Sequence, residues 1–327
     1  MVVLKIESYP GRNSAATGRI TDVLGDADDP KVEIRIAAET FDLPFEFSAA
    51  ALDEAGQVPA RVTEKECSGR KDLRDLAFVT IDGETAKDFD DAVLVEKLSS
   101  GGFRLWVAIA DVAHYVRVGS ALDRDALERG NSVYFPGECI PMLPETLSNG
   151  ICSLVPDADR LVQVAEIVFD ANGKQKEACF YAAVIRSRSR LTYTEVKRML
   201  VDKDQECCDR HAELLDALSV MAELTELRRA RRHERGSLDF DLPTAEILLD
   251  LRGRPENVVR SERNLAHKMI EEMMLAANEA VAVWVEQQQV PLLFRVHDRP
   301  GDEKMASFQD FLAHFNQGIS IPEAGVT

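Results

Sequence analysis

The sequence predicts an α+β fold, in which a small β-rich segment precedes a larger domain of mixed strands and helices. Residues 1–50 contain short apolar or alternating stretches separated by Gly- and Pro-rich turns, a pattern typical of β-strands. From residue 76 onward, apolar strands alternate with helical periodicities, and helices dominate after residue 194. The length of 327 residues suits about two domains of ordinary size.

The N-terminal segment indicates only part of a β-domain. Its predicted strands and turns are strands at residues 2–6, 18–24 and 32–36, and turns at 10–14 and 25–30. Three strands do not close a barrel, so we expect the last part of a small β-domain whose beginning lies outside this sequence. Residues 51–74 are polar and mixed, which indicates a helix or a linker.

The larger domain combines both kinds of element around a long loop. Strands are predicted at residues 78–81, 92–95, 103–109, 162–169 and 179–185. Helices are predicted at residues 120–130, 194–200, 210–232, 265–288 and 302–316. Ser120 can cap the first of these helices and Gly130 can end it. Residues 131–160 are rich in Pro, Gly, Asn and Ser and predict a long ordered loop, which in a compact domain usually serves function.

Composition narrows the class of protein. The N-terminal sequence lacks the pattern of a signal peptide, and no stretch is apolar enough to span a bilayer, so we expect no membrane association. The six cysteines include no Cys-x-x-Cys pair, which argues against zinc and favours reduced thiols in a cytoplasmic protein. No phosphate-binding Gly-x-x-x-x-Gly-Lys-Ser/Thr loop occurs, so no nucleotide cofactor is expected.

Charge gives a mixed signal. The net charge of −18 alone argues against nucleic acid, which prefers basic surfaces. Metal-binding carboxylates count as negative until an ion binds, however, and positive charge is concentrated in residues 186–198 and 228–235. Each basic segment is either a solvated helix face or a contact for nucleic acid.

The clearest motif is an acidic loop, TIDGETAKDFDDA, at residues 80–92. Four aspartates and a glutamate fall within ten residues, and apolar strands flank them. Carboxylates packed so closely raise one another's pKa, and a cation removes that cost. Oxygen ligands without His or Cys select a hard ion, Mg²⁺ or Mn²⁺. The competing interpretation is a solvated acidic turn, which the flanking strands and tight spacing disfavour.

Other acidic motifs do not match. A calcium-binding EF-hand needs glycine at its sixth position and glutamate at its twelfth. Counted from Asp82, these positions hold Lys87 and Val93, and counted from Asp88 they hold Val93 and Ser99. A carboxylate-bound Mg²⁺ instead suits phosphodiester hydrolysis, because the ion neutralises phosphate oxygens and activates a water.

Several long motifs resemble the bacterial RNase II/RNase R exoribonucleases, with RNase R the closer match. The motifs are DLRDL (72–76), the acidic loop, LWVAIADVA (105–113), SVYFPGECIPMLPETLSNGICSL (132–154), RLTYT (190–194), RG (235–236), AHKMIEEMMLAAN (266–278) and FRVHDRP (294–300). The segment ATGRITDVLGD (16–26) resembles the end of that family's second cold-shock-type domain.

The resemblance implies a partial cold-shock-like OB-fold followed by the first part of a mixed α/β exoribonuclease catalytic domain. The implied divisions are residues 1–56 for the OB part, 57–74 for a linker and 75–327 for the incomplete catalytic part. It also implies Mg²⁺-dependent hydrolysis of single-stranded RNA from the 3′ end, releasing nucleoside 5′-monophosphates.

The family's four-aspartate motif falls on Asp82, Asp88, Asp90 and Asp91. We expect all four at the metal site, with Asp82, Asp88 and Asp91 holding the ion and Asp90 most needed in the chemical step.

The resemblance also suggests residues that contact RNA. The family's stacking tyrosine falls on Tyr134, and a tyrosine in such a loop is also a good platform for an unpaired base. Tyr193 and Phe240 are weaker candidates for holding the RNA end, with core packing as the alternative. A family glutamate near the 3′ end falls on Glu271 or Glu272, and helical phasing favours Glu271. Ordinary ion pairs are the alternative for these glutamates.

The chain departs from the family pattern in extent. The family has two complete cold-shock-type domains, and its catalytic domain continues past the position of Thr327 with a Thr-Ser-Pro-Ile-Arg-Arg-Tyr motif that this sequence lacks. A second hypothesis is therefore an RNA-binding or regulatory module that has the site without turnover. Oligomeric state and natural RNA targets do not follow from the sequence.

Overall fold

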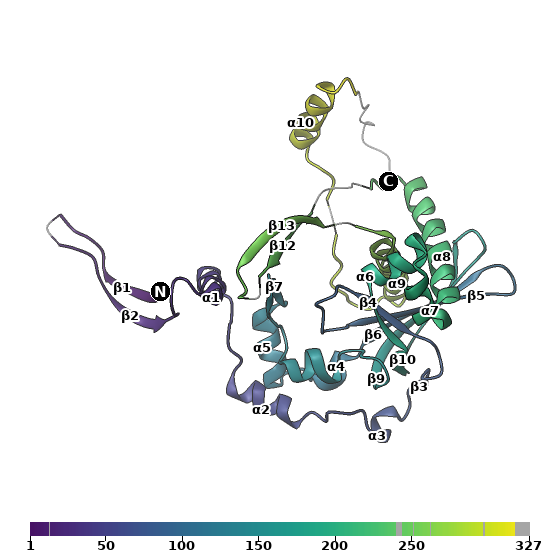
Figure 1. The fold of residues 1–327 in the computed structure, drawn as a ribbon, viewed down its shortest axis with the longest axis horizontal. Helices are drawn as coiled ribbons and strands as arrows, with labels where there is room; N and C mark the ends of the chain where they lie inside the picture. The colour runs from purple at the N-terminus through teal and green to yellow at the C-terminus, as the bar shows by residue number, and fades with distance from the viewer. Residues whose placement is uncertain (13, 240–243, 251, 262, 297, 318–327) are drawn as a thin grey trace. The chain divides into compact units, whose positions relative to one another are not determined.

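The computed structural model describes residues 1–12, 14–239, 244–250, 252–261, 263–296 and 298–317 (Figure 1). The chain divides into two compact units, residues 1–281 and 282–327. The first unit contains a short N-terminal β-hairpin and a mixed α/β region, which confirms the predicted fold class. No helix among the described residues is long and apolar enough to cross a membrane.

The first unit is organised around a seven-stranded sheet. Its strand order is β11–β4–β5–β6–β9–β10–β3. The bounds are β3 Lys71–Asp72, β4 Val79–Asp82, β5 Asp91–Lys97, β6 Phe103–Ala110, β9 Asp159–Phe169, β10 Gln175–Arg186 and β11 Ser189–Thr192. The two outermost pairs, β11 with β4 and β10 with β3, are parallel, and the inner pairs are antiparallel. Most inner strand positions are buried, as expected for a sheet covered on both faces.

The remaining strands among the described residues form three hairpins. They are β1 Val2–Ser8 with β2 Thr17–Val23, β7 Val133–Phe135 with β8 Glu138–Ile140, and β12 Thr244–Leu249 with β13 Pro255–Ser261. The α-helices are α1 Pro30–Thr40, α2 Ala49–Gln57, α3 Glu64–Cys67, α4 Val112–Tyr115, α5 Ala121–Arg129, α6 Tyr193–Lys197, α7 Gln205–Arg210, α8 Leu215–Glu234, α9 Leu265–Gln287 and α10 Asp302–Ala313. Three shorter turns of helix are η1 Thr146–Ile151, η2 Arg198–Asp202 and η3 Ala212–Leu214.

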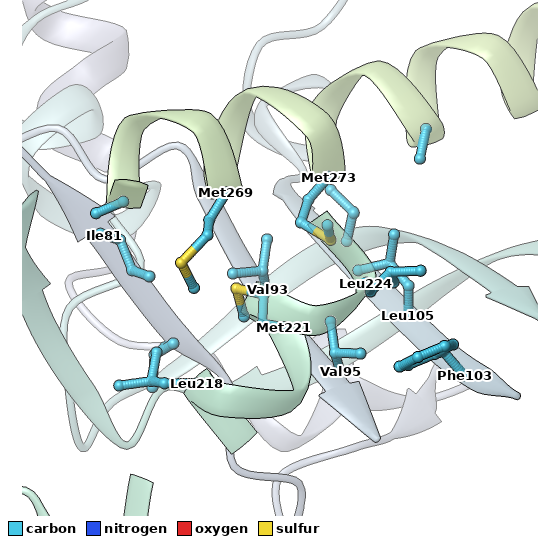
Figure 2. Close-up of a cluster of buried hydrophobic side chains, with 14 of the residues drawn as sticks. Ile81, Val93, Val95, Phe103, Leu105, Leu218, Met221, Leu224, Met269 and Met273 are labelled. Carbon is cyan, nitrogen blue, oxygen red and sulfur yellow. The ribbon is translucent and has the colours of Figure 1, made fainter. Parts of the chain in front are cut away.

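Helices α8 and α9 cover one face of the sheet with a continuous apolar core. Figure 2 shows Met221 of α8 and Met269 of α9 meeting Val93 of β5 between them. The core residues alternate along β5, where Val93 and Val95 face these helices and Leu94 faces the other way. Because successive side chains of a strand point to opposite faces, β5 contributes apolar residues to the core on both faces of the sheet.

The opposite face of the sheet is covered by α2, α5 and η1. Trp106 of β6 and Leu94 pack there with Leu122 of α5 and Leu147 of η1. The predicted caps of α5 are confirmed: the Ser120 side chain accepts a hydrogen bond from the Asp123 amide, and Gly130 follows the helix at φ 73°.

One predicted strand is wrong. Residues 32–36 alternate in polarity but lie within α1. Asp29 caps this helix by accepting a hydrogen bond from the Lys31 amide, and Pro30 occupies its first turn, where its fixed φ favours a helix start. Five alternating residues were a weaker signal than this start sequence.

The predicted long loop at residues 131–160 contains local structure. The hairpin β7–β8 forms around Gly137, which has φ 77°, and η1 follows it. Strands β3, β11, β12 and β13 were not predicted. The two that join the central sheet, β3 and β11, are 2 and 4 residues long, so they carry little periodicity of their own.

Candidate active site

The four aspartates of the acidic loop lie where β4 ends and β5 begins. Asp82 is the last residue of β4, Asp91 is the first of β5, and Asp88 and Asp90 precede it in the connection. The two strands are antiparallel neighbours, so these adjoining ends meet at one edge of the sheet. The strand pairing thus brings together the residues that the sequence singled out.

The electrostatics of this cluster oppose full ionisation. Partial burial, reinforced by the charge of Asp91, raises the pKa of Asp82 to about 7. Asp90 as a whole residue is exposed to solvent. Its carboxyl group is nevertheless partly desolvated, and this desolvation, together with the charges of Asp88 and Asp91, raises its pKa to about 6. Burial also raises the pKa of Asp91. A cation among these carboxylates would relieve both the repulsion and the desolvation.

The loop that carries Asp88 and Asp90 is held against the sheet. Phe89 is buried between these two residues, with 7% of its surface exposed. The Leu154 amide donates to the Phe89 carbonyl at 2.8 Å, and the Ala110 amide donates to the Asp90 carbonyl at 2.9 Å. The backbone on either side of the site is therefore fixed by segments distant in sequence.

Arg190 of β11 supports the other end of the same loop. Its Nη2 donates to the carbonyls of Gly83 and Glu84 at 2.7 and 2.8 Å. Its guanidinium lies 5.5 Å from the centre of the Phe89 ring, and its charge lowers the pKa of Asp82, against the larger effect of burial. The sequence placed Arg190 in a basic segment and in the motif RLTYT but did not predict its contact with the acidic loop, because the parallel pairing of β11 with β4 has no local signal.

Tyr134, the predicted stacking residue, lies beside Asp88 of the acidic loop. Its phenol donates to Oδ2 of Asp88 at 2.6 Å, and this hydrogen bond is the main reason that its pKa rises to about 12. The residue is 65% exposed, on the hairpin β7–β8. An exposed ring fixed next to the acidic cluster is suited to stacking on a base.

Tyr193 also lies near the site, because the charges of Asp82 and Asp91 add to burial in raising its pKa to about 12. Its ring stacks on His267 of α9, with centroids 3.9 Å apart and planes inclined by 17°. Burial lowers the pKa of His267. His267 was not predicted as a neighbour, since the contact joins elements 74 positions apart in the sequence. The other proposed clamp, Phe240, lies outside the described residues.

The two candidate glutamates of α9 differ in burial, and a contact of Glu271 with RNA stays a prediction. Glu272 is 1% exposed and lies on the face that also buries Met269 and Met273, whereas Glu271 is partly exposed. Arg232 of α8 donates to Glu272 at 2.8 Å.

Several arginines of the second basic segment, residues 228–235 at the end of α8, form ion pairs with acidic residues of the same chain. Arg228 and Arg235 both pair with Glu279 of α9, at 2.9 and 3.0 Å. Arg229 pairs with Asp239 at 3.0 Å. These arginines thus join α8 to α9 and to the following segment. A contact with nucleic acid at this position stays a prediction.

The donor set of the acidic cluster fits a hard divalent cation. Within the part of the chain that the structure describes, no group of three or more His, Cys, Asp or Glu side chains is arranged to hold a metal ion. The carboxylates are nevertheless oxygen donors only, and burial is the main cause of their raised pKa values, with repulsion between the aspartates adding to it at Asp82 and Asp90. Asp82, Asp88, Asp90 and Asp91 would hold such an ion, and Mg²⁺ there stays a prediction.

Comparison with known proteins identifies two domain types in the chain. The sequence model of the RNB domain matches residues 70–324, and that of the cold shock domain matches residues 1–48. Ribonuclease R of Escherichia coli (strain K12) is 43% identical over 322 residues, which are 98% of this chain and 39% of that protein. Ribonuclease R of Vibrio cholerae is 42% identical over 320 residues, with the same shares of the two chains. The chain therefore spans 39% of the length of these relatives.

Solved structures agree with the fold. Mycoplasma genitalium RNase R in complex with double-stranded RNA has a TM-score of 0.92 at 35% identity, and the match covers 100% of this chain and 57% of that one. The same protein with ribose-methylated single-stranded RNA also gives a TM-score of 0.92, with 50% of that chain covered.

Proposed function

Because the chain belongs to the RNB-domain family, which includes ribonuclease R, we propose that it carries the metal site of a hydrolytic 3′→5′ exoribonuclease. The substrate would be single-stranded RNA in the cytoplasm, and the products would be nucleoside 5′-monophosphates. The relatives with solved structures bind RNA, which supports RNA as the substrate class.

The observation that carries the proposal is the convergence of four aspartates at the junction of β4 and β5, with raised pKa values in three of them. Backbone hydrogen bonds hold the acidic loop in place, and catalytic side chains need such a fixed position. The cluster consists of the residues that match the family's aspartate motif.

The aspartates would divide the work between them. Asp82, Asp88 and Asp91 would hold Mg²⁺, with Mn²⁺ as a possible substitute. When bound, the ion would neutralise phosphate oxygens and activate a water for attack. Asp90, the only one of the four whose whole residue is exposed, would orient the attacking water and accept its proton.

The RNA end would lie across the exposed ring of Tyr134. Stacking of a base on this ring would place the terminal phosphodiester beside the aspartates, because the phenol donates a hydrogen bond to Asp88. Tyr193 would line the same region from the side of α6. Glu271 is the better candidate of the glutamate pair for reaching RNA, because Glu272 is buried against Arg232.

The test is a cleavage assay of the full chain. A 5′-labelled single-stranded RNA is incubated with Mg²⁺ or with EDTA, and the products are separated by length. We expect a descending ladder with Mg²⁺ only, and a fall in rate of at least about 100-fold in Asp90→Asn. The matched control is Asp216→Asn, an exposed aspartate in the first turn of α8, which should cleave like the original chain.

The competing function has its own outcome in this assay. The alternative is an RNA-binding module that has the site without turnover. RNA binding that requires Tyr134, without Mg²⁺-dependent cleavage, would identify an RNA-binding module and would contradict the enzymatic proposal for this chain.

A further inference from the structure

Ser153 connects the acidic loop to the motif SNGICSL, which the proposed function does not use. The side chain is fully buried, with 0% exposed. Its Oγ accepts a hydrogen bond from the Phe89 amide at 3.1 Å and donates one to the Lys87 carbonyl at 2.8 Å. These two backbone groups flank Asp88, so one hydroxyl fixes the chain on both sides of a predicted metal ligand.

Ser153 is itself held by a buried arginine. Arg160 is 8% exposed, and its Nε donates to the Ser153 carbonyl at 2.7 Å. Its Nη2 donates to the Gly150 carbonyl at 3.1 Å. The Leu154 amide, next along the chain, donates to the Phe89 carbonyl. The hydrogen bonds therefore run without interruption from Arg160, through the backbone at Ser153, to the acidic loop.

We propose that Ser153 is a positioning residue for the metal site, which sets the orientation of Asp88 and Asp90 through the backbone of residues 87–89. The proposal rests on the proposed function, because it assumes that the aspartates bind a divalent cation. Phe89 points into the core while its two neighbours carry the carboxylates, so a rotation of the backbone here would move both ligands together.

Physical reasons favour a positioning role over simple filling of the core. A buried serine that serves only packing needs one hydrogen-bond partner for its hydroxyl. The hydroxyl of Ser153 acts both as a donor and as an acceptor, and both partners lie on one short loop. Partners that orient metal ligands through hydrogen bonds typically change metal affinity by about 10- to 100-fold when they are removed.

The chain provides a matched control in Ser187. This serine is equally buried, at 1% exposed, and its hydroxyl donates to the backbone carbonyls of Phe78 and Ser189 at 3.4 and 3.3 Å. It contacts the start of β4 rather than the acidic loop. Removing either hydroxyl deletes hydrogen bonds to the backbone at a buried position, so both alanine variants should lower Tm.

The experiment measures binding of Mn²⁺, as a spectroscopic probe, to the full chain at a temperature where every variant is folded. We expect Ser153→Ala to weaken Mn²⁺ binding about 10- to 100-fold, and Ser187→Ala to leave it unchanged. Ser153→Thr, which keeps the hydroxyl, should recover much of the affinity if it folds. Hydrogen exchange of the segment containing the Phe89 amide should accelerate in Ser153→Ala and not in Ser187→Ala.

Equal Mn²⁺ affinity in Ser153→Ala and the original chain would overturn the proposal and leave the proposed function intact. Equal weakening in the Ser153 and Ser187 variants would also overturn it, because the effect would then follow stability alone. If the original chain bound no Mn²⁺, or bound it independently of Asp82 and Asp91, the proposed function and this inference would both fail. If Ser153→Ala does not fold, Arg160→Met provides the second variant, with the same expected loss of Mn²⁺ affinity and the same overturning result.

Discussion

The phenol of Tyr134 donates a hydrogen bond to Asp88 at 2.6 Å, which joins the exposed ring of one hairpin to the acidic cluster of the central sheet. The two residues are 46 positions apart in the sequence. One side chain therefore has two separable parts: a ring available for stacking and a hydroxyl engaged with a predicted metal ligand.

Substitutions at Tyr134 should separate these parts. Tyr134→Ala removes the ring, and we expect it to weaken binding of single-stranded RNA by the equivalent of about 1–3 kcal/mol. Tyr134→Phe keeps the ring and should retain most of the affinity. Fluorescence anisotropy with a short labelled RNA in EDTA measures this. A similar loss in both variants would show that the hydroxyl, rather than stacking, is responsible.

The raised pKa of Asp82 predicts how stability changes with pH. Its pKa in the folded chain is about 7, above the ordinary value for aspartate, so the folded state holds more protons than the unfolded state between those values. The metal-free chain should therefore lose stability as pH rises through this range, with the loss complete above about 7. Asp82→Asn cannot ionise, so in EDTA its Tm should exceed that of the original chain at pH 8 and match it at pH 4.

Addition of Mg²⁺ should reverse this difference. A ligand that binds only the folded state raises its stability by RT ln(1 + L/Kd), where L is the free ligand concentration, and the ionised carboxylates are the binding form. At pH 8, Mg²⁺ should raise the Tm of the original chain more than that of Asp82→Asn. An equal rise in both would place the bound ion elsewhere in the chain.

Arg190 should stabilise the acidic loop through hydrogen bonds and lower the pKa of Asp82 through its positive charge. Arg190→Met removes two hydrogen bonds to the carbonyls of Gly83 and Glu84, and we expect a loss of about 1–3 kcal/mol in the free energy of unfolding. Loss of its positive charge should raise the pKa of Asp82 further, which shifts the pH dependence of metal binding upward. The control is Arg188→Met, an exposed neighbour two residues away that should behave like the original chain. Denaturant unfolding and Mn²⁺ titration at several pH values measure the two effects.

Glu272 should serve stability rather than RNA binding. It is buried on α9 and accepts a hydrogen bond from Arg232 of α8, which is partly exposed. Glu272→Gln keeps the shape and removes the charge, and we expect a loss of about 1–3 kcal/mol in the free energy of unfolding. The control is Glu226→Gln, whose carboxylate is exposed and pairs with Arg229, where a loss below about 1 kcal/mol is expected. A change in RNA affinity without a change in stability would contradict this assignment.

The sequence predicted the fold class and most elements of the central sheet, because each long strand carries its own periodicity. The same reasoning failed at residues 32–36, where five alternating positions were outweighed by Asp29 and Pro30 at a helix start. The short strand β11 was missed because only its parallel pairing with β4 defines it.

The candidate site shows the same division between local and distant information. The aspartates were found because they are close together in the sequence. The residues that support the site were not predicted. Arg190 and Ser153 contact the acidic loop, and His267 stacks on Tyr193, from elements that are far away in the sequence and that no local pattern links to the site. The burial of Glu272 did not follow from the helical pattern, because the face of α9 that is covered depends on the packing of α8.

The parallel pairing of β11 with β4 has a consequence for the order of events during synthesis. Asp82 is aligned with Thr192, so the edge of the sheet beside the acidic loop is completed by residues 110 positions later in the chain. Closing a loop of that length is slow compared with forming the hairpin β5–β6. A growing chain would therefore carry all four aspartates outside the ribosome well before it could hold them in place, and tight metal binding should begin only after β11 has emerged.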